Sequence, residues 1–185
     1  MNAVLQSAID QTLERQLLTR RLRQSRDCFI AALADVPEEL CRLCPADDRW
    51  SVIDCAEHIA IAENAWSVRL QGRQPLIEPF DQAKDEMVNR VADRNEKRSA
   101  PERAQPKGRY KALADAVEEF RVARERTIAF AEGTKEDFRQ FSVEHALGLL
   151  DVHQFLLLAA AHAECHAKQI KEIKASAAYR AAFRK

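Results

Sequence analysis

The chain has 185 residues, of which 46% are hydrophobic and 31% charged, and its 29 Lys and Arg side chains balance its 29 Asp and Glu side chains. This length suits one domain, residues 1–185, with a core of ordinary size. The balanced charge creates no overall field toward nucleic acid or an anionic membrane, so we expect neither as a partner.

The composition favours helices. The chain has four Gly and six Pro, and all six prolines lie between Pro37 and Pro106, which leaves a proline-free stretch on either side. The longest apolar run, Phe155–Ala161, is far shorter than the roughly 20 residues of a membrane span. Residues 1–10 do not resemble a signal peptide, and the number of cysteines, five, is odd. We therefore expect reduced thiols in a cytoplasmic protein.

The first predicted helix covers about Leu13–Asp35. Its apolar positions recur at helical spacing: Leu18, Leu22, Phe29, Leu33 and Val36, with Ser25 and Ala32 on the same stripe. Its other face is basic, through Arg15, Arg20, Arg21, Arg23 and Arg26. Because Glu14 and Asp27 offset this charge, we interpret the basic face as solvated rather than as a nucleic-acid interface.

The second predicted helix begins after Ser51, which forms a capping-box pattern with Asp54, and ends near Leu70, before Gly72. The stretch from Gly72 to Gly108 then has four prolines, dense charge and weak periodicity. Within it we expect a helical piece over Gln82–Arg94 and otherwise a long connection.

The third predicted helix covers Ala112–Glu132, before Gly133, and the fourth runs from the N-cap Asp151 to Ala175. The Ala-rich tail up to Lys185 predicts a short extra helix. We find no strand-like alternation. The pattern predicts an all-α four-helix bundle, and a link of roughly 35 residues between the second and third helices allows these two to run parallel.

Three histidines are candidate metal ligands. His162 and His166 are four residues apart, so their side chains share one helical face, together with the apolar Phe155, Ala159 and Ile173. His58 lies on the second helix among small residues: Ser51, Cys55, Ala62 and Ala65. Three neutral imidazoles on facing helices would leave a fourth metal position open, as in catalytic zinc sites. Buried core histidines without a metal are an equally valid interpretation of the spacing alone.

The other two histidines have different positions. His153 lies about 180° around its helix from His162, so we expect it to face outward. His145 precedes the fourth helix and reaches the site only if its loop folds over it.

Three segments resemble the DinB-like superfamily. The "WS…HLA…E" signature of that family is similar to Trp50–Ile53 followed by Glu57–Ala60 and Glu63. Its second signature, "H…H..QI", is similar to His162–Ile170. Pro106–Tyr110 also resembles the linker of one large branch, so the likeness extends from about Leu22 to Ile173. One departure is His145–Gly148, where many relatives have His-Pro-x-x-Gly.

The resemblance implies an up-down-down-up bundle, a divalent metal on His58, His162 and His166, and frequent homodimers. Characterised relatives include transferases and isomerases that use low-molecular-weight thiols, and many members have no known reaction. Zinc or nickel are the expected metals, although imidazole ligands accept several transition ions.

Other polar residues near these motifs have two interpretations each. Cys55 and Cys165 are possible sulfur ligands or small core residues, and we favour the core. Cys41 and Cys44 have redox spacing without the strand that such motifs follow. Asp54 is expected to cap its helix rather than to orient His58. For three acids we expect solvated positions or helix contacts: Glu57, Glu63 and Glu164.

We therefore expect a metal-dependent enzyme acting on a small molecule, either a thiol transferase or a hydrolase. The alternative is a non-catalytic metal-binding stress or sensor protein. A bundle that has lost its metal and only binds partners is a third possibility.

Overall fold

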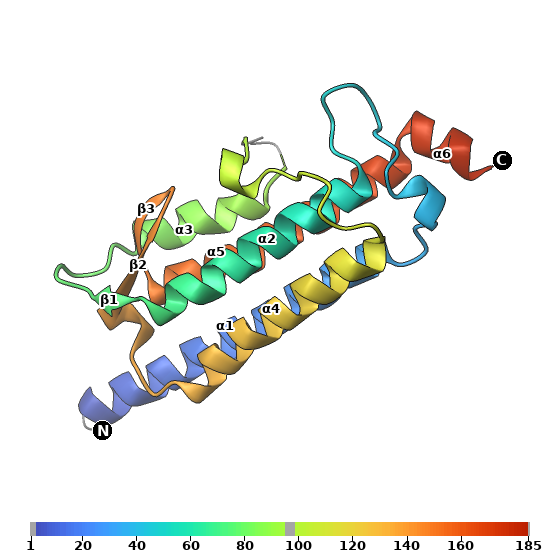
Figure 1. The fold of residues 1–185 in the computed structure, drawn as a ribbon. Coiled ribbons are helices and arrows are strands. Elements are labelled where there is room, and N and C mark those ends of the chain that lie inside the picture. The colour runs from blue at the N-terminus through green and yellow to red at the C-terminus, as the bar shows by residue number, and fades with distance from the viewer. Residues whose placement is uncertain (1–2, 95–98, 185) are drawn as a thin grey trace.

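The computed structural model describes residues 3–94 and 99–184, with side chains from Asp10 onward, and these residues form a four-helix bundle with shorter elements at both ends and along one side (Figure 1). The long helices are α1 (Ala3–Leu33), α2 (Val52–Gln71), α4 (Leu113–Gly133) and α5 (Val152–Ala175). In Figure 1, α1 and α5 run in one direction, and α2 and α4 run in the opposite direction. A bundle is thus the observed fold, as the sequence predicts.

The predicted apolar stripe of α1 is buried, with Leu22 and Phe29 fully inaccessible. It packs mainly against α5 and α4, while α2 packs against α4 and α5. Complete burial of a Leu or Phe side chain stabilises the fold by about 1.5–3 kcal/mol. The apolar core divides into two clusters, whose boundary lies between Ala60 and Ala62 on α2 and between Ala160 and Ala163 on α5.

A fully buried arginine lies at this boundary. Arg124 of α4 uses all five of its N–H donors: two on the carboxylate of Glu63, one on the hydroxyl of Ser25, and two on backbone carbonyls. The two carbonyls are those of Leu22 and Ala159. One guanidinium therefore connects α4 with the other three helices of the bundle.

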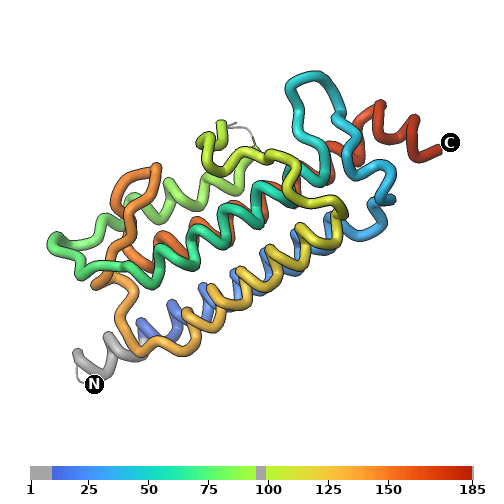
Figure 2. Tube along the Cα trace, in the orientation of Figure 1, coloured from blue at the N-terminus to red at the C-terminus, as the bar shows by residue number. Residues whose placement is uncertain are grey.

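The long connection between α2 and α4 folds back along the bundle, as the Cα trace shows (Figure 2). It contains a short strand β1 (Gln74–Pro75), α3 (Ala83–Asn89) and two 3-10 turns, η2 (Arg90–Ala92) and η3 (Glu102–Ala104). The helical piece expected over Gln82–Arg94 is thus present. Because α3 and η2 pack on α5, the connection covers a face of α5 that a bare bundle would expose.

The described residues also form a small antiparallel sheet, so the expectation of no strands is wrong. β2 (Phe141–His145) pairs with β3 (Gly148–Asp151) and with β1. His145 is opposite Gly148, so Ala146 and Leu147 make the turn, and Gly148 adopts a φ of 97°. The strands lie at the end of the bundle and are short. Segments of this length are too short to show an alternating pattern of apolar and polar residues in the sequence.

The ends of α2, α4 and α5 agree closely with the sequence, whereas α1 begins ten residues before the predicted Leu13. Ser51 and Asp151 each form a complete capping box, at the start of α2 and of α5. Short elements complete the fold: η1 (Glu38–Leu40), η4 (Phe138–Gln140) and α6 (Ala177–Phe183), which is the predicted extra helix. Within residues 3–94 and 99–184, no helix combines the length and the apolar character needed to cross a membrane.

Candidate metal centre

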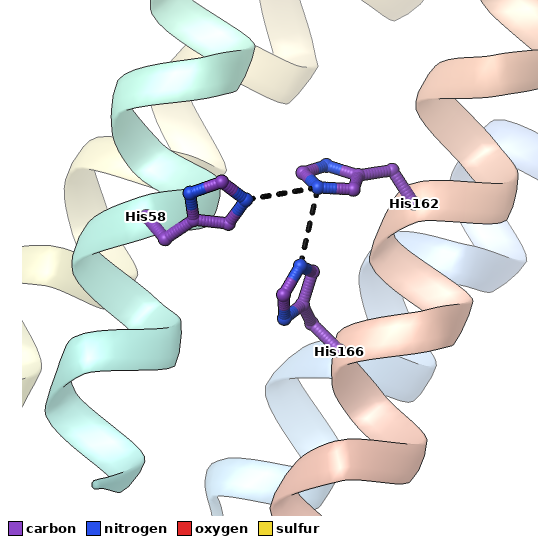
Figure 3. A group of neighbouring side chains, drawn as sticks. All are labelled: His58, His162 and His166. Atoms are coloured by element: carbon purple, nitrogen blue, oxygen red, sulfur yellow. Dashed lines mark hydrogen bonds between the residues drawn. The ribbon is translucent and has the colours of Figure 1, made fainter. Parts of the chain in front are cut away.

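His58 from α2 and His162 and His166 from α5 point toward one another across the gap between the two helices (Figure 3). We call these three residues the histidine triad. The Nε2 atom of His162 lies 3.0 Å from Nε2 of His58 and 3.1 Å from Nε2 of His166. Ligand atoms of the three side chains all lie within 4.8 Å of one another. The one-turn spacing on α5 and the facing position on α2 therefore meet as the sequence predicts.

A backbone carbonyl fixes the tautomer of His58. Its Nδ1 lies 2.6 Å from the carbonyl oxygen of Ala104 in η3. Since a carbonyl oxygen only accepts, Nδ1 carries the proton, and the Nε2 lone pair of the neutral ring faces the other two imidazoles. The long connection thus orients a side chain of α2.

Burial keeps the triad neutral. Removal from water is the largest cause that lowers the pKa of His58, opposed by its bond to the Ala104 carbonyl. Burial also lowers the pKa of His162 and His166 well below the usual value, and the neighbouring imidazoles act in the same direction. All three rings are therefore neutral at neutral pH, each with one unprotonated nitrogen, as ligation of a metal requires.

Two tryptophans enclose the triad. Trp50, immediately before the N-cap of α2, has its ring 4.9 Å from that of His58 and stacks against that of His166 at 6.1 Å. Trp66 lies 5.0 Å from the ring of His162 on the other side. Only His162 of the triad is more than slightly exposed. These apolar walls limit the access of water.

The residues present fit a divalent metal ion. With metal–nitrogen distances of about 2.0–2.1 Å, two imidazole nitrogens of a tetrahedral site lie about 3.3 Å apart. The 3.0 and 3.1 Å separations in the triad are close to this value. The Nδ1 atom of His166 is buried and has no hydrogen-bond partner among the described residues. Three converging, neutral nitrogen donors make a chemically suitable ligand set.

Comparison with known proteins identifies the family. The sequence model of the DinB superfamily matches residues 21–170, which is most of the chain.

The chain belongs to the DinB superfamily.

Relatives of this DinB-superfamily chain agree with its fold. It is 27% identical to the uncharacterized protein YuaE of Bacillus subtilis (strain 168) over 131 residues, which are 70% of this chain and 80% of YuaE. The structure of YfiT from Bacillus subtilis superposes on this chain with a TM-score of 0.58 and 15% sequence identity, and the match covers 86% of this chain and 85% of YfiT. YfiT is described as a probable metal-dependent hydrolase with an unusual four-helix bundle topology. TT2238, described as a four-helix bundle protein, gives a TM-score of 0.52 at 18% identity over 85% and 98%.

The cysteines of this DinB-superfamily chain do not join the triad among the described residues. Cys55 is completely buried and its thiol pKa is raised, chiefly by that burial. Cys165 is half-buried, its pKa is also raised by burial, and the Arg94 guanidinium lies 4.0 Å from its Sγ atom. Cys41 is buried against Glu38, whereas Cys44 is exposed, so this pair does not form a shared pocket.

His145 lies near the triad but outside it. Its ring contacts that of Trp66 at 5.6 Å, and Trp66 in turn contacts His162 at 5.0 Å. The expected outward position of His153 is wrong: it is 9% exposed, and its Nδ1 lies 3.3 Å from Glu14. Because α1, α3 and η2 also pack on α5, the face opposite the triad is covered as well.

The carboxylates were partly misjudged from the sequence. Asp54 caps α2 as expected, and Ala65 of the predicted small-residue lane is exposed. Glu57 and Glu63 are each only 1% exposed, so neither is solvated, although Glu63 makes the alternative that the sequence predicted, a helix contact, with Arg124 and Thr127 of α4. Glu57 accepts the backbone N–H groups of Lys107 at 2.6 Å and Arg109 at 2.9 Å.

Sequence reasoning also missed the roles of Ala104 and Trp66, because a carbonyl oxygen and a contact between distant rings leave no local pattern. For the surroundings of the triad, the one available signal was Trp50, which directly precedes a helix cap and comes about two helical turns before Glu57 and His58.

Proposed function

We propose that the histidine triad holds one divalent metal ion, zinc or nickel, and that the protein is a metal-dependent enzyme of the hydrolase class acting on a small molecule. The observation that carries this proposal is the convergence of three neutral imidazole nitrogens within 4.8 Å in a partly enclosed site. Membership of the DinB superfamily and the likeness to YfiT support it.

A divalent ion in such a site supplies Lewis acidity, which polarises a carbonyl group and activates a water molecule or thiol as a nucleophile. The chain's own residues provide the setting for that chemistry. The Ala104 carbonyl holds the proton of His58 on Nδ1, which keeps Nε2 available as a donor atom. Trp50 and Trp66 exclude bulk water from two sides, which strengthens electrostatic interactions within the site.

Thiol transfer is the second candidate, and one observation favours it. No sulfur atom of the described residues belongs to the triad's group of ligand atoms. A small thiol from solution could therefore supply the soft, anionic donor that three neutral imidazoles lack. A low-molecular-weight thiol would then be a cosubstrate.

Metal content tests the proposal directly. Protein purified without an affinity tag or added metal should contain about one ion per chain by elemental analysis. The His162→Ala variant should lose it, because two imidazoles hold a divalent ion far more weakly than three. The His145→Asn variant is the matched control, since this ring lies outside the triad, and it should retain the ion. Full metal retention in His162→Ala would falsify the assignment.

Cobalt substitution distinguishes the two chemistries. Addition of a small thiol such as cysteine to the cobalt-loaded protein should produce a sulfur-to-metal charge-transfer band if thiol transfer is correct. Hydrolysis is favoured if no band appears and the protein cleaves an ester or amide substrate. Stoichiometric metal without either result would leave the non-catalytic metal-binding protein as the better assignment.

A further inference from the structure

A groove of about 990 Å³ opens at the end of the bundle that carries the sheet. Its walls come from the last turn of α2, the loop after β1, η3 and the β2–β3 hairpin. His145 lines this groove, and its ring contacts Trp66, whose ring also contacts His162. The groove is thus one aromatic side chain away from the histidine triad.

Two arginines line the groove without a carboxylate partner. Arg69 donates one hydrogen bond to the backbone carbonyl of Glu144 at 2.9 Å, and Arg103 makes no hydrogen bond or ion pair among the described residues. By contrast, several other arginines pair with acids, such as Arg73 with Glu136 and Arg94 with Glu172. The groove therefore offers guanidinium donors that the fold itself does not use.

Both guanidinium groups act electrostatically on His145, which also lines the groove. Burial of the ring is the largest cause that lowers the pKa of His145 to about 4, and the positive charges of Arg69 and Arg103 come next. The ring is therefore neutral at pH 7. Its Nδ1 accepts the backbone N–H of Leu147 at 3.2 Å, which places the ring proton on Nε2. Arg69 and Arg103 therefore lie close enough to His145 to disfavour a further positive charge there.

The rest of the lining limits the charge of a ligand and offers it apolar contacts. Glu78 and Glu144 also line the groove, so its formal charge is balanced and a second negative charge on a ligand would be repelled. Pro75, Leu76 and Val143 provide an apolar wall. An arginine fork matches the geometry of a carboxylate, so one carboxylate on an apolar body complements these walls.

We propose that this groove binds a small organic monocarboxylate, whose carboxylate is held by Arg69 and Arg103 and whose apolar body lies along Leu76 and Val143. This ligand site goes beyond the metal-dependent function proposed above, because the residues that line the groove do not include the histidine triad. Binding in the groove itself needs no metal, so the two proposals can fail separately.

Calorimetric or NMR titration of the metal-free protein with phenylacetate tests the inference. Phenylacetate should bind, and the Arg69→Gln and Arg103→Gln variants should each weaken binding about tenfold, through loss of one charge-assisted hydrogen bond. Arg20→Gln is the control: it removes an exposed arginine of α1 that does not line the groove, so it should not change the affinity for phenylacetate. Phenylacetamide, which lacks the charge, should bind at least tenfold more weakly than phenylacetate.

Four results would overturn the inference. One is equal binding of phenylacetate and phenylacetamide, and a second is unchanged affinity in both groove variants that retain the native circular dichroism spectrum. The third is tighter binding of phenyl phosphate than of phenylacetate, which would replace the carboxylate with a phosphate ester. In the fourth, binding requires zinc, disappears in His162→Ala and persists in Arg69→Gln and Arg103→Gln. Such a result would place the anion on the metal, which supports the metal centre and refutes the groove.

Discussion

The buried pair of Arg124 and Glu63 allows the most quantitative test of how the bundle is held together. Both side chains are at most 1% exposed, and two hydrogen bonds of 2.8 and 2.9 Å join them. Replacement of Arg124 with Met leaves a carboxylate inside the core with only the Thr127 hydroxyl as a partner. The loss of one member of a buried ion pair costs about 3–5 kcal/mol.

The double replacement separates charge from packing. Glu63→Met alone should cost a similar amount, because the buried guanidinium then lacks its counter-ion. Glu63→Met combined with Arg124→Met leaves no buried charge, and buried pairs replaced by apolar residues are often neutral in stability. The carbonyls of Leu22 and Ala159 lie within helices and keep their helical hydrogen bonds, so the loss of the guanidinium at these two groups lowers the stability little. The double variant should therefore be more stable than either single variant by about 2 kcal/mol or more.

Urea unfolding of the metal-free protein at pH 7.5, followed by circular dichroism, measures all four free energies of unfolding. A double variant whose loss of stability equals the sum of the two single losses would refute the argument. Such additivity would mean that Arg124 stabilises the bundle through its volume and carbon chain alone.

Three further outcomes follow from the structure. The unfolding free energy of the metal-free protein should decrease as the pH falls below about 6.5. The pKa values of the triad are lowered in the folded state, so the imidazoles of the unfolded chain protonate first. Each histidine can lower the unfolding free energy by up to about 1.4 kcal/mol per pH unit. Urea titrations at pH 7.5 and 5.5 check this, and equal stability at the two would contradict it. Glu57→Gln should increase amide hydrogen exchange at Lys107 and Arg109 roughly tenfold, through loss of charged acceptors, whereas the exposed Glu118→Gln should not. We also expect a homodimer, so light scattering at high micromolar concentration should give twice the 21.0 kDa chain mass; a monomer there would be evidence against it.

Local patterns in the sequence were enough to predict the helices and the triad. The cap at Ser51 and the periodic burial of α1 each depend on residues within a few turns of one another. His162 and His166 share a face for the same reason. Their meeting with His58 follows once α2 and α5 pack side by side.

The errors concern residues whose surroundings come from distant segments. His153 faces away from the triad, as predicted, but that direction leads to Glu14 of α1 and not to solvent. Glu57 looks like a surface acid until the connection brings the N–H groups of Lys107 and Arg109 onto it. No local periodicity reports contacts between residues 50 or more positions apart. The domain boundaries, the partners and the cytoplasmic location stay predictions.

The packing of α1 against α5 has a consequence for synthesis of the chain. α5 begins roughly 120 residues after α1 ends, and at about 5–20 residues per second its translation follows that of α1 by about 6–24 s. During this interval the apolar stripe of α1 has no native neighbour on α5, and His58 has neither of its two companions. The nascent chain therefore cannot assemble the triad, and a metal ion could be acquired only after α5 has left the ribosome.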